Sequence, residues 1–242
     1  VFGLALADYV AFTILHEASH GLIGRGKPLL NQLVGEAAAT MLVCRFNGFR
    51  QIHLRHHRAT NDPEGDPDHW IGRGPSWQRP LRIAAADLHY WAAFDRKRRT
   101  SLLAERVSDA TLLALGVLVL GGLFAGRGLD LLVLWLLPAR LALFACTWLF
   151  DYLPHQRPYA PARERDPIRA TVCVKAGPVL EAALLGHTLH LLHHLHPTVP
   201  FYRLPALWRQ LRPGILASGG REVSLFSLPR PVESRGATGE AG

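Results

Sequence analysis

Two long apolar runs stand close together in the second half of the chain, at residues 110–125 and 129–150. Only the tight connection GRGL lies between them, and the second run is interrupted by Asp130, Pro138 and Arg140. A helix needs about 20 apolar residues to cross the hydrocarbon core of a bilayer, so the second run is long enough and the first slightly short. The pattern predicts a transmembrane hairpin whose outer ends lie on one side; a buried hairpin of a soluble protein is the alternative.

The first half of the chain is less uniformly apolar. Residues 1–15 carry one interior charge, Asp8, and can span a membrane if the helix continues into the histidines that follow. In residues 29–46 a polar stripe recurs at every fourth position, as in a helix that lies in the membrane interface: Gln32, Glu36, Thr40 and Cys44. We predict that this segment lies flat or re-enters, because a full crossing would put the histidines before and after it on opposite sides.

Two further segments complete the pattern. Residues 81–94 predict an amphipathic helix with interfacial aromatic anchors. The chain opens at Val1 inside an apolar run that lacks the basic start and cleavage site of a signal peptide, so we expect it to continue a longer chain. Residues 214–242 are rich in Gly, Ser, Arg and Pro, which predicts a membrane domain over 1–213 followed by a flexible cytosolic tail.

The charge balance is basic, with a formal net charge of +8. In a chain with apolar blocks this favours an anionic lipid surface as partner, and no nucleic-acid-binding motif is present. Arginine clusters at residues 96–99 and 157–169 flank the hairpin on the side that carries the histidines, which predicts that this side is cytoplasmic. The three cysteines form no C-x-x-C motif and are typical of reduced thiols.

Histidine is frequent, with 13 residues, and most of them stand in three short groups. The first group reads H-E-x-x-H, and each of the other two reads H-x-x-H-H. Spacings of three and four predict that the imidazoles of a group share one helical face. Without a metal, clustered buried imidazoles would each need a hydrogen-bond partner and would repel one another when protonated. The grouped residues are His16, His20, His53, His56, His57, His190, His193 and His194.

The first group also matches the signature of zinc peptidases, in which His16 and His20 would share a zinc ion and Glu17 would be the general base. That interpretation leaves both H-x-x-H-H groups unexplained. Eight histidines are too many for one catalytic zinc, which takes three protein ligands and a water, but they suit two metal ions. Imidazole binds zinc, copper, iron and nickel, so the residues predict a two-metal site without choosing the metal.

The three groups, in this order, resemble the histidine boxes of the membrane fatty acid desaturase superfamily. The segments HLRHHRATNDPEGDPDHW and HLLHHLHPTVPFYRLP also look like segments of that family. FDYLPH, residues 150–155, is similar to the branch that includes bacterial carotenoid ketolases and hydroxylases. The resemblance covers nearly the whole chain. It implies an all-α fold, an integral membrane helical bundle of usually four spans under a cytosolic helical cap that holds a di-metal site.

The same resemblance implies the contents of the site: two iron ions, O2 as co-substrate, and electrons from a ferredoxin or cytochrome. It adds His155 as a ninth metal ligand and places Asp151 where a further polar contact to the site is expected. No catalytic residue beyond the metal ligands is expected. From the residues themselves, Asp62 or Asp66 is a candidate to hydrogen-bond an imidazole, with a solvated turn as the alternative. Glu17 either orients an imidazole or is a charge at a helix end.

The implied function is that of an oxygen-dependent, non-haem di-iron oxidoreductase of the fatty-acyl desaturase type, acting on a membrane lipid by desaturation or hydroxylation. The alternative is a carotenoid hydroxylase or ketolase. Two alternatives of another class are an H-E-x-x-H zinc membrane peptidase and a non-catalytic lipid- or metal-binding membrane protein. The expected location is the bacterial inner membrane, with the histidine groups facing the cytoplasm.

Overall fold

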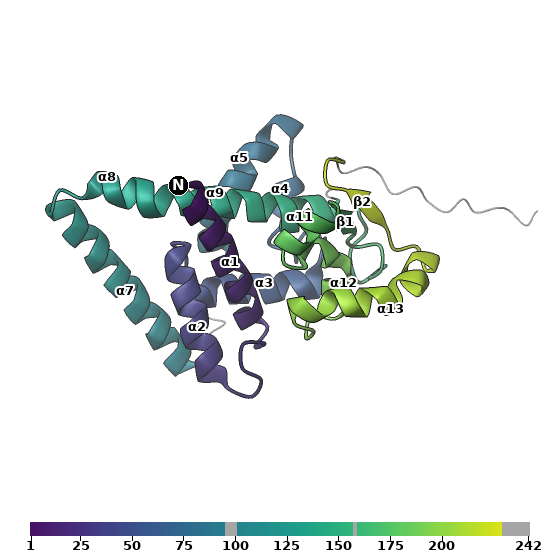
Figure 1. Ribbon diagram of the computed structural model, residues 1–242, viewed down its shortest axis with the longest axis horizontal. Helices are drawn as coiled ribbons and strands as arrows, with labels where there is room; N and C mark the ends of the chain where they lie inside the picture. Colours follow the sequence, from purple (N-terminus) through teal and green to yellow (C-terminus); the bar gives the residue numbers. More distant parts are fainter. Residues whose placement is uncertain (95–100, 157–158, 229–242) are drawn as a thin grey trace, which may run out of the picture.

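A membrane-sized helical hairpin forms one side of the molecule (Figure 1). The structure is a computed structural model that describes residues 1–94, 101–156 and 159–228. Two helices in it are long and apolar enough to cross a membrane by length and composition, Leu102–Phe124 and Gly128–His155, and only 6% and 22% of their most apolar stretches are buried. They correspond to the two predicted apolar runs, so the hairpin is present as predicted.

The second helix of the hairpin is continuous but not regular. Two of its segments, Leu132–Leu136 and Thr147–Tyr152, are π-helical. A π-helical segment fits an extra residue into a turn and so rotates every residue that follows it. The second segment lies immediately before His155 and therefore sets the direction of that side chain. The α-helical parts are α8 (Gly128–Leu131), α9 (Leu137–Cys146) and α10 (Leu153–His155).

The helices α1 (Phe2–Ser19) and α2 (Pro28–Met41) run side by side between the arms of the hairpin (Figure 1). The 14 residues of α2 extend about 21 Å at 1.5 Å per residue, less than the ~30 Å hydrocarbon core. The chain then turns into α3 (Phe46–Ala59), which returns toward the end of α1. A Cβ atom at Gly35 would lie 2.4 Å from the Phe46 ring, so only glycine permits this close approach.

Gln32 and Glu36, the first two residues of the polar stripe, lie in α2 and face α7 (Leu102–Phe124). Glu36 accepts hydrogen bonds from Gln32, at 2.8 Å, and from Ser108 of α7. Next to them, Arg45 pairs with Glu105 at 2.7 Å and with Asp109 at 2.8 Å. These groups satisfy one another in an apolar setting. They explain why α7 begins eight residues before the apolar run at residue 110.

The cap consists of short helices around α3. The segment predicted as one amphipathic helix over 81–94 is two helices, since the chain turns at Ala85. The elements of the cap are α4 (His69–Gly72), a 3₁₀ turn (Ser76–Gln78), α5 (Arg79–Ala84), α6 (Ala86–Ala93), β1 (Cys173–Lys175), α11 (Pro178–Ala183), a 3₁₀ turn (His187–Leu189), α12 (His190–Leu195), a 3₁₀ turn (Phe201–Arg203), α13 (Leu204–Ala217) and β2 (Glu222–Ser224).

The described chain is mainly helical and has almost no strand, which confirms the all-α class. The two strands are three residues each and pair in parallel, Cys173 opposite Glu222. The division at residue 213 stays a prediction, although α13 continues across it to Ala217 and β2 adds a further pairing. Residues 229–242 of the predicted tail and the arginines at 96–99 and 157 lie outside the described residues. Each cysteine is free.

Candidate metal centre

Five histidines from three helices converge at the junction of bundle and cap. Their candidate ligand atoms all lie within 4.8 Å of one another: His16 and His20 from the end of α1, His53 and His57 from α3, and His193 from α12. The Nε2 atom of His53 lies 2.9 Å from that of His20 and 3.1 Å from that of His57. Residues before and after α2 therefore share one site, as predicted.

A second cluster of four histidines adjoins the first. Its members are His56, His155, His190 and His194, again within 4.8 Å of one another and all buried. Nε2 of His190 lies 2.9 Å from that of His155 and 3.0 Å from that of His194. All nine histidines named from the sequence thus belong to one of two clusters.

Each H-x-x-H-H group is shared between the clusters instead of presenting three imidazoles on one face. In α3, His53 and His57 enter the first cluster and His56 the second. In α12, His190 and His194 enter the second cluster and His193 the first. The reason is the angle between side chains around the helix axis. Two histidines four residues apart, such as His53 and His57, differ by about 40°, whereas the adjacent His56 and His57 differ by about 100°. The helices α3 and α12 therefore lie between the two clusters and join them.

The spacing of the nitrogens fits metal ions better than hydrogen bonds. Neighbouring Nε2 atoms lie 2.9–3.1 Å apart. Two ligands at right angles, each ~2.1 Å from a shared ion, would be separated by ~3.0 Å. His57 Nε2 has two such neighbours, His53 and His193. One ring nitrogen is either a donor or an acceptor, so it suits two neighbouring nitrogens poorly unless all three point their lone pairs at a cation.

Burial keeps these imidazoles neutral, which is the form that binds metals. The pKa values of His53, His57, His193 and His194 lie well below the ordinary histidine value, because burial penalises the charged form and neighbouring histidines add repulsion. A metal-binding histidine is usually held by a hydrogen bond from its other ring nitrogen. The donor set and its charge state therefore fit two ions that accept imidazole ligands.

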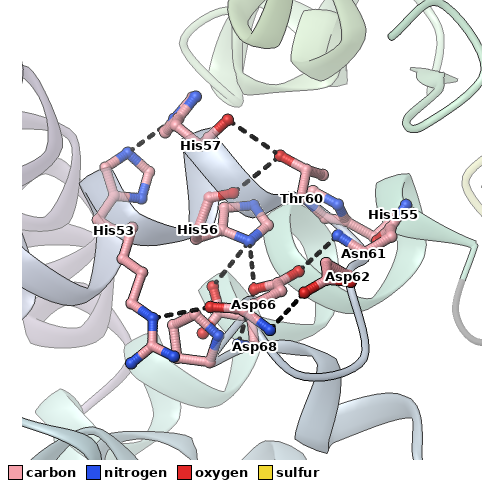
Figure 2. A network of polar contacts seen from close by, with 12 residues as sticks. His53, His56, His57, Thr60, Asn61, Asp62, Asp66, Asp68 and His155 are labelled. Atoms are coloured by element: carbon pink, nitrogen blue, oxygen red, sulfur yellow. Dashed lines mark hydrogen bonds and ion pairs between the residues drawn. The ribbon is translucent and has the colours of Figure 1, made fainter. Parts of the chain in front are cut away.

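Two contacts of this kind orient histidines of the second cluster, and Figure 2 shows the first of them, at His56. His56 Nδ1 lies 2.9 Å from Asp66 Oδ1 and 3.3 Å from Asp68 Oδ2, and both carboxylates are buried. His194 Nδ1 lies 3.3 Å from the Thr60 hydroxyl, which itself donates to the His56 carbonyl oxygen at 2.9 Å. Each contact engages Nδ1 and leaves Nε2 directed toward the cluster.

The other candidates from the sequence have different environments. Asp62 accepts from the Gly65 backbone N–H at 2.5 Å and so shapes the turn. Glu17 is buried, with Oε1 3.6 Å from His16 Nδ1 and Oε2 accepting from the Phe201 N–H at 3.3 Å. Asp151 lines the cavity described below. Sequence reasoning missed Asp68 and Thr60, although both follow the second histidine group closely.

A cavity of about 1040 Å³, including its open mouth, ends at the histidines. It reaches both clusters, since His16 and His53 of the first and His56 of the second line it. Most of its wall is apolar or aromatic, from α1, α3, the end of α6 and the long second helix: Phe12, Leu15, Phe49, Tyr90, Trp91, Phe94, Leu143 and Phe150. The aromatic residues of the predicted segment 81–94, Tyr90, Trp91 and Phe94, thus line the cavity.

Arg140, the arginine within the second apolar run, contacts Asp87, which lines this cavity. Arg140 pairs with Asp87 of α6 and donates to the Leu42 carbonyl oxygen at 3.4 Å. The pair joins the second helix of the hairpin to α6, whose Tyr90 and Trp91 line the cavity. Arg140 therefore has partners on two other elements.

Comparisons with known proteins agree with this geometry. The family model described as fatty acid desaturase matches residues 1–226. A beta-carotene ketolase of Paracoccus sp. is 30% identical over 216 residues, covering 84% of this chain and 76% of its own length. An sn-1 oleoyl-lipid 12-desaturase of Picosynechococcus sp. is 25% identical over 232 residues, covering 83% of this chain and 65% of its own length. A second Paracoccus ketolase is 27% identical.

Proposed function

The chain belongs to the fatty acid desaturase family, and from that premise we propose that it is an oxygen-dependent di-iron oxidoreductase that oxidises a C–H bond of an apolar membrane lipid. One observation carries the proposal: nine buried or half-buried histidines form two adjoining clusters at the inner end of an apolar cavity. A hydrolase of water-soluble substrates would need a cavity that admits water and a polar substrate. The mainly apolar wall of this cavity favours neither.

The nine histidines are the proposed ligands of two irons, five for one ion and four for the other. When bound, the irons would supply the activation of O2 with two electrons from a carrier protein. The protein's own part is to hold the imidazoles neutral and directed, to exclude water, and to place one carbon of the substrate next to the clusters. Asp66, Asp68 and Thr60 hold the imidazoles, and the aromatic wall excludes water and places the substrate.

Two substrate classes fit an apolar cavity of this kind, an acyl chain and a carotenoid. The aromatic side chains of its wall favour a flat, conjugated or ring-bearing molecule, since aromatic rings stack on flat apolar surfaces. Two of the three relatives named above are carotenoid ketolases. We therefore place carotenoid oxidation beside acyl desaturation as a second candidate.

Expression in two hosts separates these candidates. One host makes β-carotene, and the other makes only saturated and monounsaturated acyl chains; the extracted lipids of each are then analysed. Oxygenated carotenoids in the first host would support carotenoid oxidation, and new double bonds in the second would support acyl desaturation. Active protein that holds one zinc and no iron would overturn the di-iron proposal.

The orientation in the membrane follows from charge. We propose that the cap lies in the cytoplasm of a bacterial cell, because arginines gather on the cap side of the hairpin. The described ones include Arg163, whose side chain donates to the His194 carbonyl oxygen at 2.7 Å. This basic face is also the proposed dock for an acidic ferredoxin or cytochrome. Its ionic attraction would act within ~10 Å at 0.1 M salt.

A further inference from the structure

One histidine outside the two clusters lines the cavity. His187 is buried, and its ring centre lies 5.4 Å from that of His16. It stacks on Phe150 at 4.2 Å between ring centres. It belongs to neither group of converging ligand atoms. His187 therefore forms part of the substrate wall beside the first cluster and not part of the cluster.

The chain adopts an unusual backbone to place this ring. Leu185 and Gly186, directly before it, have φ of +51° and +78°. A Cβ atom at Gly186 would also lie 2.9 Å from the Phe201 carbonyl oxygen, so glycine is required there. A leucine in the left-handed region costs free energy, and such strain gathers at functional sites. The Tyr9 hydroxyl donates to the Leu184 carbonyl oxygen at 2.9 Å and ties the turn to α1.

One nitrogen of the ring is already engaged. His187 Nε2 lies 3.0 Å from the Thr13 hydroxyl, and that hydroxyl lies 3.3 Å from the Tyr9 carbonyl oxygen. A carbonyl only accepts, so the single hydroxyl hydrogen of Thr13 goes to Tyr9, and Nε2–H must donate to Thr13. A neutral ring protonated at Nε2 has a hydrogen-bond acceptor at Nδ1. Within the described chain, Nδ1 has no hydrogen-bond partner.

We propose that His187 is a positioning residue whose Nδ1 accepts a hydrogen bond from the hydroxyl of a lipid alcohol in the cavity, an inference that rests on the proposed function. An acceptor distinguishes an alcohol, which has an O–H, from a hydrocarbon or a ketone, which have none. The residue thus selects an alcohol for further oxidation and lets a ketone leave.

The chemistry requires such an alcohol if a CH2 group is to become C=O. In the first oxidation, O2, two electrons and two protons convert the CH2 group into CHOH and release water. In the second, the same reagents insert oxygen into the remaining C–H bond and release water, and the resulting geminal diol loses water to give the ketone. The electrons come from the carrier protein in both rounds. An alcohol that stays bound by His187 enters the second round without dissociating.

Binding without turnover tests the proposal directly. The probes are β-carotene, its ring alcohol and its ring ketone, added to purified iron-loaded enzyme without a reductant and followed by quenching of tryptophan fluorescence. We expect the alcohol to bind about 5-fold more tightly than either other probe, the size of one net hydrogen bond. Equal binding of alcohol and ketone, or binding of none of the three, would overturn the proposal.

Paired variants separate positioning from packing. His187→Phe keeps an aromatic ring on Phe150 and should lose the alcohol preference while iron content stays unchanged. Thr13→Val removes the partner of Nε2 and should weaken the preference, whereas Thr13→Ser should keep it. His89→Phe is the matched control, since His89 stacks on Trp70 at 4.5 Å outside the cavity wall. If His187→Phe retained the preference, the assignment would be wrong.

Product analysis distinguishes this failure from failure of the proposed function. In the β-carotene host, His187→Phe should release more alcohol and less ketone than the parent at a similar total oxidation. An unchanged ratio of alcohol to ketone would overturn the role of His187 alone. No oxidation product from the parent in either host would instead contradict the proposed function itself.

Discussion

The imidazole of His56 lies between the second cluster and a pair of buried carboxylates, with Nδ1 2.9 Å from Asp66 Oδ1 and 3.3 Å from Asp68 Oδ2. Asp66 also accepts from the Asn61 N–H at 2.7 Å and from the Asp68 N–H at 2.9 Å, so the turn holds it in place. A carboxylate at Nδ1 makes Nε2 the lone-pair nitrogen and raises its basicity. The acidic turn therefore holds the proposed metal ligand His56 through its Nδ1 atom, on the side of the ring away from the cluster.

Asp66→Asn should lower iron affinity or lipid oxidation by ~10–100-fold, because the amide is a weaker acceptor for the His56 ring. Asp62→Asn is the matched control in the same turn, since Asp62 bonds the Gly65 backbone. Iron per chain and product formation at equal protein levels measure both. Equal losses in the two variants would mean that the turn matters for folding and not for His56.

The presence of two clusters leads to a separate prediction, about the number of metal ions that the protein binds. The parent should hold about two irons per chain by elemental analysis. His57→Ala removes a member of the five-histidine cluster and His155→Ala a member of the four-histidine cluster, so each should lose at least one iron and all product. His89→Phe should keep both irons. Full iron content in either cluster variant would contradict its histidine as a ligand.

Much of this site is predictable from the sequence because it is local. The i, i+3 and i+4 spacing brings the three imidazoles of each H-x-x-H-H group close together, and a family resemblance supplied His155. The assignment of His56 and His193 to opposite clusters depends on how α3 and α12 lie against each other, which no spacing within one helix contains. Thr60 and His187 depend on the same packing, since their partners are 134 and 174 residues away in the chain.

The fold, like the site, has features that one segment of sequence predicts and features that depend on packing between segments. The two apolar runs predicted the hairpin, since span length is a property of one segment. The π-helical segment Thr147–Tyr152 was not predicted, because its extra residue is accommodated by neighbouring helices. Gln32 and Glu36 belong to the polar stripe recognised in the sequence, and in the structure they bond to each other and to Ser108 of α7. A polar stripe reveals that a helix needs polar partners, but it does not tell whether headgroups or another helix supply them.

Thr60 provides a test on the neighbouring ligand. Thr60→Val removes the acceptor for the His194 ring at constant volume, and we expect a ~10-fold loss of iron affinity or activity. Thr60→Ser restores the hydroxyl and should recover most of it. Thr60 is fully buried and also bonds the His56 carbonyl oxygen, so thermal unfolding of both variants is measured alongside. A serine variant as impaired as the valine variant would exclude the hydroxyl as the cause.

The proposed donor dock predicts a salt-dependent effect. Arg165→Glu reverses one charge on the cap side and should slow carrier-dependent turnover more at low salt than at high salt, because salt screens exposed charges. Arg127→Glu is the control at the opposite end of the hairpin, where Arg127 pairs with Asp130. Turnover is measured against carrier concentration at two ionic strengths. A loss that is independent of salt and carrier would instead indicate anchoring to lipid headgroups.

The last prediction concerns Glu17, which separates a zinc peptidase from a lipid oxidase. As the general base of a peptidase it would be indispensable, and Glu17→Gln would abolish activity with metal still bound. In the oxidase the substrate oxygen comes from O2, so no metal-bound water has to be deprotonated for attack.

The contacts of Glu17 are a Phe201 N–H at 3.3 Å and the Nδ1 side of His16 at 3.6 Å. A glutamine oxygen accepts the same N–H, so Glu17→Gln should keep at least a tenth of the lipid oxidation. His16→Gln and His20→Gln should keep none. The assay is product formation in membranes at matched protein levels. Complete loss in all three variants, with protease activity in the parent, would make the H-E-x-x-H group a peptidase site.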